Sequence, residues 1–153
     1  MLSGTDRCDE NGGNRRCTEC SLSVRSAELI TYPSGSQLLP GRGFYEIKGL
    51  AWSGGGAIRT VEVSTDGGRK WSPAEFKGTP QRMAHTRFSY AWNWDGNETE
   101  ILSRCTDEIG QQQPTLQQIA KFFDKPLGNV PGLNNSIMPW KIAKDGSVTN
   151  GLA

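Results

Sequence analysis

Hydrophobic and polar residues alternate along much of this chain with a period of two, which is typical of β-strands that bury one face. Val61 and Val63 alternate with polar residues in this way. Residues 44–52 carry apolar side chains on both faces and therefore predict a central strand. The expected strands are residues 24–32, 44–52, 60–64, 70–76, 86–95, 100–107 and 137–143.

Glycine, proline and asparagine mark the turns between these strands. Asp66-Gly67-Gly68 offers the positive φ angles of a two-residue hairpin turn, so residues 70–76 are expected to return beside the preceding strand. Pro73 lacks a backbone N–H and places this second arm at a sheet edge or a bulge. The glycines at 54–56 are expected to connect two strands, because the Lys-Ser or Lys-Thr and the helix of a phosphate-binding loop do not follow them.

One short helix and a polar leader complete the expected organisation. Thr115 can cap residues 115–123, where apolar residues recur three and four positions apart. Residues 1–22 have almost no apolar periodicity and are expected to form a flexible leader, which leaves residues 23–153 as one domain. The pattern predicts an all-β fold, an immunoglobulin-like antiparallel β-sandwich of six or seven strands with one short helical segment.

Composition and charge exclude several classes of function. The formal net charge of 153 residues is +1, so no overall field favours nucleic acid or an anionic membrane. No apolar run approaches the roughly 18 residues that span a bilayer, and the N-terminus has no apolar segment of a signal peptide. We expect a soluble chain that binds neither nucleic acid nor membrane.

The candidates for metal or catalytic chemistry are few. Cys17 and Cys20 have the spacing of half a zinc site, but the other half is missing, so these two are expected to be unpaired thiols, with zinc binding as the weaker alternative. Cys8 is assigned no role. Cys105 lies in an alternating strand and is expected to be buried. His85, the one histidine, has no nucleophile motif nearby and is expected to be structural or exposed. The carboxylate pairs Glu98 with Glu100 and Asp107 with Glu108 are expected to be solvated. We therefore assign no catalytic, cofactor-binding or metal-binding residue.

The most aromatic stretch leaves two interpretations open. Phe88, Tyr90, Trp92 and Trp94 alternate along residues 86–95 and place rings on one face of a strand. Such a row is most often part of a sandwich core. It could instead form an exposed platform for a carbohydrate, single-stranded nucleic acid or a protein partner, as in a binding module.

Several motifs of this chain occur together in one known family. Residues 51–54 (Ala-Trp-Ser-Gly), 61–64 (Val-Glu-Val-Ser), 66–68 (Asp-Gly-Gly) and Trp71 are followed by Thr86-Arg87-Phe88 and by residues 92–96 (Trp-Asn-Trp-Asp-Gly). The order continues with residues 103–107 (Ser-Arg-Cys-Thr-Asp), Gly110, Gln113-Pro114, Asn134-Asn135 and Trp140-Lys141-Ile142. Over about residues 26–150 the chain resembles the C-terminal dimerisation domain of the sulfite oxidase family of molybdopterin oxidoreductases, and it is most similar to the bacterial sulfane or sulfite dehydrogenase branch.

The resemblance implies a scaffold without catalytic activity of its own. In this family the sandwich follows a larger domain that holds the molybdenum cofactor through a cysteine thiolate, and the parent enzyme oxidises sulfite or sulfane sulfur and passes electrons to a c-type cytochrome. It implies a homodimer and, from this branch, a periplasmic location. Four residues of the matching motifs are candidate interface residues: Trp52, Arg104, Asp107 and Trp140.

The chain also departs from the family pattern. Neither Cys8, Cys17 nor Cys20 lies in a context similar to the molybdenum-ligand motif. Residues 137–139 lack the basic residue that approaches the substrate pocket in eukaryotic sulfite oxidases, so we expect no direct substrate contact. The first 25 residues differ from the family, which leads us to expect a truncated or misread reading frame.

Overall fold

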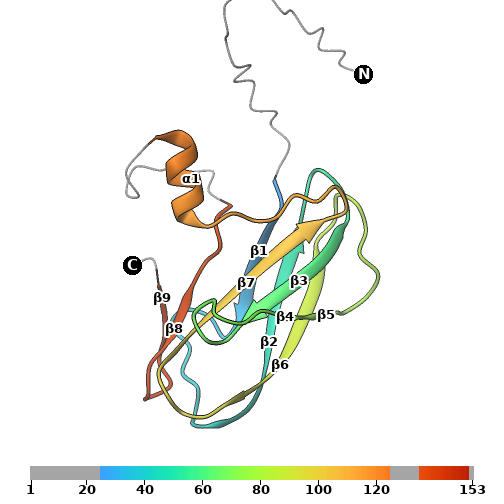
Figure 1. Cartoon of the computed structure of the whole chain (residues 1–153). Coiled ribbons are helices and arrows are strands. Elements are labelled where there is room, and N and C mark those ends of the chain that lie inside the picture. The colour runs from blue at the N-terminus through green and yellow to red at the C-terminus, as the bar shows by residue number, and fades with distance from the viewer. Residues whose placement is uncertain (1–24, 125–134, 152–153) are drawn as a thin grey trace, which may run out of the picture.

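The computed structural model describes residues 25–124 and 135–151, so the predicted leader at residues 1–22 and the possible zinc ligands within it lie outside the described residues. Figure 1 shows an elongated body of strands with one helix beside one end. The elements are β1 (Ala27–Tyr32), β2 (Gly43–Trp52), β3 (Ile58–Ser64), β4 (Ser72–Pro73), β5 (Glu75–Phe76), β6 (Thr86–Trp94), β7 (Thr99–Asp107), α1 (Leu116–Phe123), β8 (Trp140–Ile142) and β9 (Val148–Asn150).

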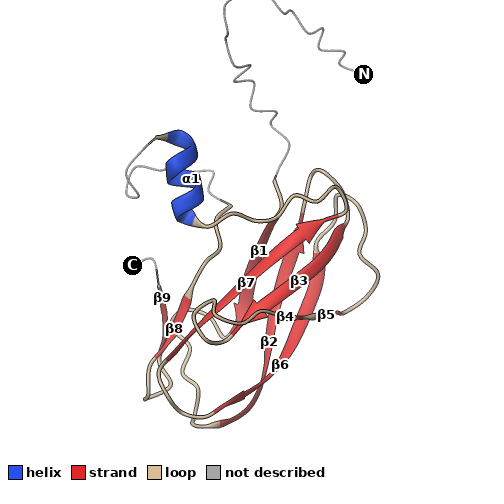
Figure 2. Cartoon of the chain, viewed as in Figure 1, coloured by secondary structure: helices blue, strands red, loops and turns tan. Residues whose placement is uncertain are grey.

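The strands form two antiparallel sheets that pack face to face (Figure 2). Sheet 1 has the order β1-β2-β6-β5, and sheet 2 has the order β4-β3-β7-β8-β9. This arrangement confirms the predicted β-sandwich, and β2 is central as expected from the apolar residues on both of its faces. The chain passes from sheet 1 to sheet 2 between β2 and β3 and again between β6 and β7.

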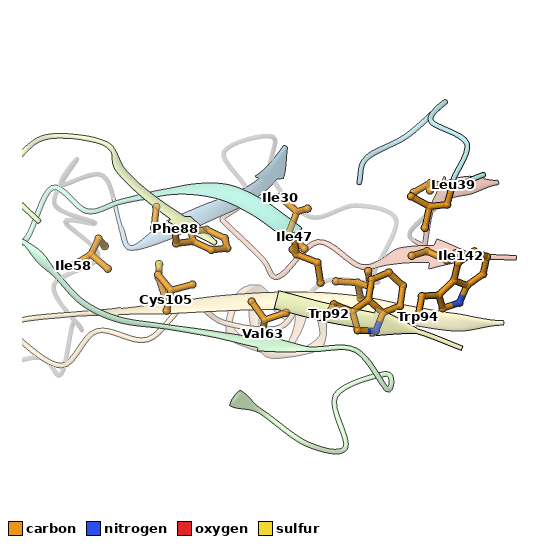
Figure 3. Packing of buried hydrophobic residues seen from close by; sticks show 14 residues of the cluster. Ile30, Leu39, Ile47, Ile58, Val63, Phe88, Trp92, Trp94, Cys105 and Ile142 are labelled. Atoms are coloured by element: carbon orange, nitrogen blue, oxygen red, sulfur yellow. The ribbon is translucent and has the colours of Figure 1, made fainter. Parts of the chain in front are cut away.

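The core consists of the inward-facing residues of both sheets (Figure 3). Phe88, Trp92 and Trp94 keep 1%, 7% and 2% of their surface exposed, and the indole N–H of Trp94 donates to the carbonyl of Asn97 at 2.8 Å. Across the layer, Ile101 and Cys105 are fully buried, which confirms the prediction for Cys105. Because Trp92 and Trp94 are buried inside the sandwich, the alternative of an exposed aromatic platform is wrong.

The segment after β3 differs from the predicted hairpin. Val63 pairs with Ser72, so the strands are joined by a long loop and not by a two-residue turn. Gly67 and Gly68 do adopt positive φ angles of 73° and 87°, but the loop is held by side chains. The carboxylate of Asp66 accepts hydrogen bonds from the backbone N–H groups of residues 69 and 70 at 3.0 and 2.9 Å. The predicted second arm is divided between β4, at the edge of sheet 2 as Pro73 indicated, and β5 in sheet 1.

The C-terminal part contains one more strand than predicted. Residues 137–143 form only the short strand β8, and β9 pairs with it through Ile142 and Val148. The helix α1 has the predicted cap, since the Thr115 hydroxyl accepts from the N–H of Gln118 at 3.2 Å. None of the helices in the described ranges has the length and hydropathy needed to cross a bilayer.

Candidate functional site

The region around His85 is the place where catalytic groups could converge, because the histidine lines a cavity. Its imidazole and the Trp52 ring form a T-shaped pair, with 5.1 Å between ring centroids and an interplanar angle of 83°. The two residues line a small cavity with Ser53, Gly54, Met83 and Ala84. His85 itself is exposed, as predicted, and the one hydroxyl of the lining, on Ser53, is used elsewhere: it donates to Asp107.

Asp107 is the centre of a buried polar network at the end of β7. Its Oδ2 accepts hydrogen bonds from Ser53 Oγ at 2.7 Å and from Ser26 Oγ at 3.1 Å. Its Oδ1 accepts from the backbone N–H groups of Gln111 at 2.8 Å and Ile109 at 3.2 Å. Burial alone would raise the pKa of Asp107, but the hydrogen bonds from Ser53, Gln111 and Ser26 outweigh it and hold that pKa below its usual value.

The burial of Asp107 corrects the expectation that this carboxylate is solvated. It has no exposed surface, whereas the neighbouring Glu108 is exposed and forms an ion pair with Arg82 at 3.0 Å. The two acids are neighbours in the sequence but do not share an environment. In a strand, adjacent side chains point to opposite faces, so Asp107 shares the inward face of Cys105 and Glu108 does not.

Glu28 is a second buried acid, and the sequence analysis missed it. It lies on β1 with 5% of its surface exposed, accepts a hydrogen bond from Ser103 Oγ, and leaves Oε1 without a partner among the described residues. Burial raises its pKa to about 7, and the hydrogen bond from Ser103 offsets only part of that increase. The signal that could have revealed it is its position two residues before Ile30, because alternate residues of a strand share one face.

The described residues do not fit a molybdenum or other metal site. Within residues 25–124 and 135–151, no group of three or more His, Cys, Asp or Glu side chains lies close enough to share an ion. Burial raises the pKa of Cys105 to about 12, and the nearby carboxylates of Glu28 and Asp107 raise it further. Because a metal binds the thiolate, this cysteine is unsuited to be a ligand.

The four candidate interface residues lie in different places. Arg104 is on the outer face of sheet 2, where its Nε lies 2.8 Å from Glu62 Oε2 and its guanidinium 4.1 Å from the centroid of the Trp71 ring. Trp140 lines an open groove beside β1 and β9, Trp52 contacts His85, and Asp107 is interior. The structure therefore does not join them into one patch, and their role in an interface stays a prediction.

Comparison with known proteins gives the family context. Residues 16–135 match the family described as the Mo-co oxidoreductase dimerisation domain. Mitochondrial sulfite oxidase of Rattus norvegicus is 37% identical over 103 residues, which are 61% of this chain and 18% of that protein. Nitrate reductase [NADH] 1 of Arabidopsis thaliana is 30% identical over 130 residues, 75% of this chain and 13% of the relative.

A solved structure extends the similarity to the fold. The sulfane dehydrogenase SoxCD from Paracoccus pantotrophus superposes with a TM-score of 0.76 at 38% identity, covering 83% of this chain and 32% of that one. The chain thus spans less than a fifth of the curated relatives above and about a third of the SoxCD chain. Since the family match includes most of the sandwich, this chain belongs to the Mo-co oxidoreductase dimerisation domain family.

Proposed function

We propose that this domain joins two copies of a larger molybdenum-dependent oxidoreductase into a homodimer and has no catalytic activity alone. The observation that carries the proposal is the match of residues 16–135 to a family described by dimerisation. The interior supports it, because the inward side chains of both sheets pack against one another in one apolar cluster. A scaffold needs such a rigid body, whereas an enzyme needs convergent polar groups in a pocket.

The parent reaction in this proposal is the oxidation of sulfite or sulfane sulfur. Two similarities support a sulfur substrate over nitrate: the SoxCD chain is 38% identical, and rat sulfite oxidase 37%, against 30% for the Arabidopsis nitrate reductase. We assign the molybdenum cofactor to another domain of the parent enzyme, because Cys105, the one cysteine among the described residues, is buried and its pKa of about 12 keeps it a thiol. A c-type cytochrome as electron acceptor and a periplasmic location follow from the sulfane dehydrogenase branch.

Sedimentation velocity over roughly a hundredfold range of protein concentration tests the central part of the proposal. We expect a reversible monomer–dimer equilibrium that shifts to dimer as the concentration rises. Adding molybdopterin and sulfite to the purified chain should give no turnover. A chain that stays monomeric throughout would contradict the scaffold role, and measurable sulfite oxidation would contradict the absence of catalysis.

A further inference from the structure

The four edges of the two sheets are protected to different degrees. Strands β4 and β5 are only two residues long, and β4 contains Pro73. The outer side of β9 is covered, since Ser36 N–H donates to the Val148 carbonyl at 3.2 Å and Val148 N–H donates to the Gln37 carbonyl at 3.1 Å. Strand β1 has six residues and, within the described part of the chain, pairs only with β2. It is the long open edge of the described sandwich.

The first four residues of β1 lack the usual protection of an edge strand. Edge strands are commonly protected by lysine, proline or a bulge that disrupts further pairing. Here the outward side chains are those of Leu29, which is 40% exposed, and Thr31. Glu28 directs its carboxylate inward to Ser103 and so puts no charge at the edge. A register shift occurs only after Ile30, which leaves the first four residues of β1 regular.

An apolar groove adjoins the same edge. Its lining includes Leu29, Ile30, Leu38, Trp140 and Val148, and its volume is about 1020 Å³. Leu38 is 67% exposed at its rim. Exposed leucines beside an open strand are costly in water and are typical of a surface that a partner covers.

We propose that β1 pairs antiparallel with β1 of a second copy of this chain, about a two-fold axis near Leu29, and that the partner closes the apolar groove. The inference rests on the proposed homodimer and names its surface. A second copy fits because a two-fold axis sets the same strand against itself, with Leu29 opposite Leu29 and no like charges facing each other. The backbone groups of the open edge then gain the hydrogen bonds of a continued sheet.

A cysteine cross-link tests both the position and the symmetry of the pair. In a background with Cys8→Ser, Cys17→Ser and Cys20→Ser, a single Leu29→Cys should form an intermolecular disulfide in a glutathione buffer. Opposed residues of antiparallel strands lie about 4.5–5.5 Å apart at Cα, which is within disulfide range. Phe44→Cys is the matched control, because Phe44 is 73% exposed on β2, away from the β1 edge. It should remain monomeric on non-reducing gels.

A charge at the same position tests the energetics. Leu29→Lys should weaken the dimer by about tenfold or more, because two lysines would face each other across the axis, while Phe44→Lys should leave the dissociation constant unchanged. Far-UV circular dichroism and thermal melting confirm that both variants fold. If the wild-type chain dimerises but Leu29→Lys dimerises equally well and Leu29→Cys does not cross-link, this surface is wrong and the scaffold role stands. If the wild-type chain is always monomeric, both proposals fail.

Discussion

The hydroxyl of Ser53 donates a 2.7 Å hydrogen bond to the carboxylate of Asp107, 54 residues away along the chain. Ser53 follows the last strand residue of β2 in sheet 1, and Asp107 ends β7 in sheet 2, so this bond ties the two layers together at one end of the sandwich. The same carboxylate fixes the turn after β7 through the N–H groups of Ile109 and Gln111. Asp107 therefore stabilises the contact between the two sheets, and removing its carboxylate should lower the stability of the domain.

Replacing Asp107 by asparagine should destabilise the domain by about 3 kcal/mol, because the charge is lost and the amide nitrogen cannot accept from two of the four donors. The measurement is urea unfolding followed by tryptophan fluorescence. Glu108→Gln is the matched control and should cost less than about 1 kcal/mol, since that side chain is 42% exposed. Equal effects of the two substitutions would contradict the assigned network.

The pH dependence of the Asp107 variant has a defined sign. Since the folded-state pKa lies below the ordinary aspartate value of 3.8, the carboxylate stabilises the fold above that pH. This contribution is lost as the pH falls through the folded-state pKa. The difference between wild type and Asp107→Asn should therefore be constant near neutrality and shrink in acid.

Glu28 should have the opposite effect on stability. Its folded-state pKa of about 7 lies above the ordinary glutamate value of 4.5, so the fold is favoured while the group is protonated. This advantage is lost as the pH rises from 4.5 through 7. Glu28→Gln keeps the neutral shape at every pH. The free energy of unfolding of the variant, relative to that of the wild type, should therefore increase by up to about 3 kcal/mol between pH 5 and pH 8.

The other ionisable groups near Glu28 define the control for this experiment. Cys105 and Asp107 both lie on β7, which packs against β1, and both are unchanged in the variant. The difference between the two unfolding curves therefore isolates Glu28. A difference that does not vary between pH 5 and pH 8 would show that Glu28 titrates near its ordinary value.

Gly49 is a third position with a sharp expectation. A Cβ at this residue would lie 2.3 Å from Cζ of Phe88 and 2.6 Å from the Leu29 carbonyl oxygen, so Gly49→Ala should destabilise the domain by about 1–3 kcal/mol. Chemical unfolding of the variant measures this cost. Combining it with Phe88→Leu should recover only part of the loss, because the contact with the backbone of Leu29 remains. An alanine variant as stable as wild type would contradict the packing of β2 against Phe88.

Arg104 should be sensitive to a change that preserves its charge. Arg104→Lys loses the planar group over the Trp71 ring, and we expect a cost of about 1 kcal/mol in thermal unfolding. In a double-mutant cycle with Trp71→Leu, most of this cost should disappear. Lys48→Ala is the control, because Lys48 pairs with Glu46 at 3.2 Å but is 57% exposed and should contribute little. If the effects of the two substitutions simply add, Arg104 and Trp71 have no interaction energy, and the proposed stacking is wrong.

The sequence by itself determined the longer strands and the side chains that form most of their buried faces. The alternation around Trp92 and Cys105 is a local property of the chain, because successive side chains of a strand point to opposite faces. The structure confirms both of these residues as core. The cap at Thr115 was equally predictable, since capping involves only the first turn of the helix.

Only the tertiary structure decided what depends on contacts between distant residues. Strand β9 is too short to be seen by alternation and is held by β8 and by backbone bonds from residues 36 and 37. The division of residues 70–76 between two sheets is likewise set by their partners β3 and β6. Asp107 is buried because Ser26 and Ser53 converge on it from far along the chain. Burying a charge is tolerated only where such donors meet it, and their meeting is a property of the fold.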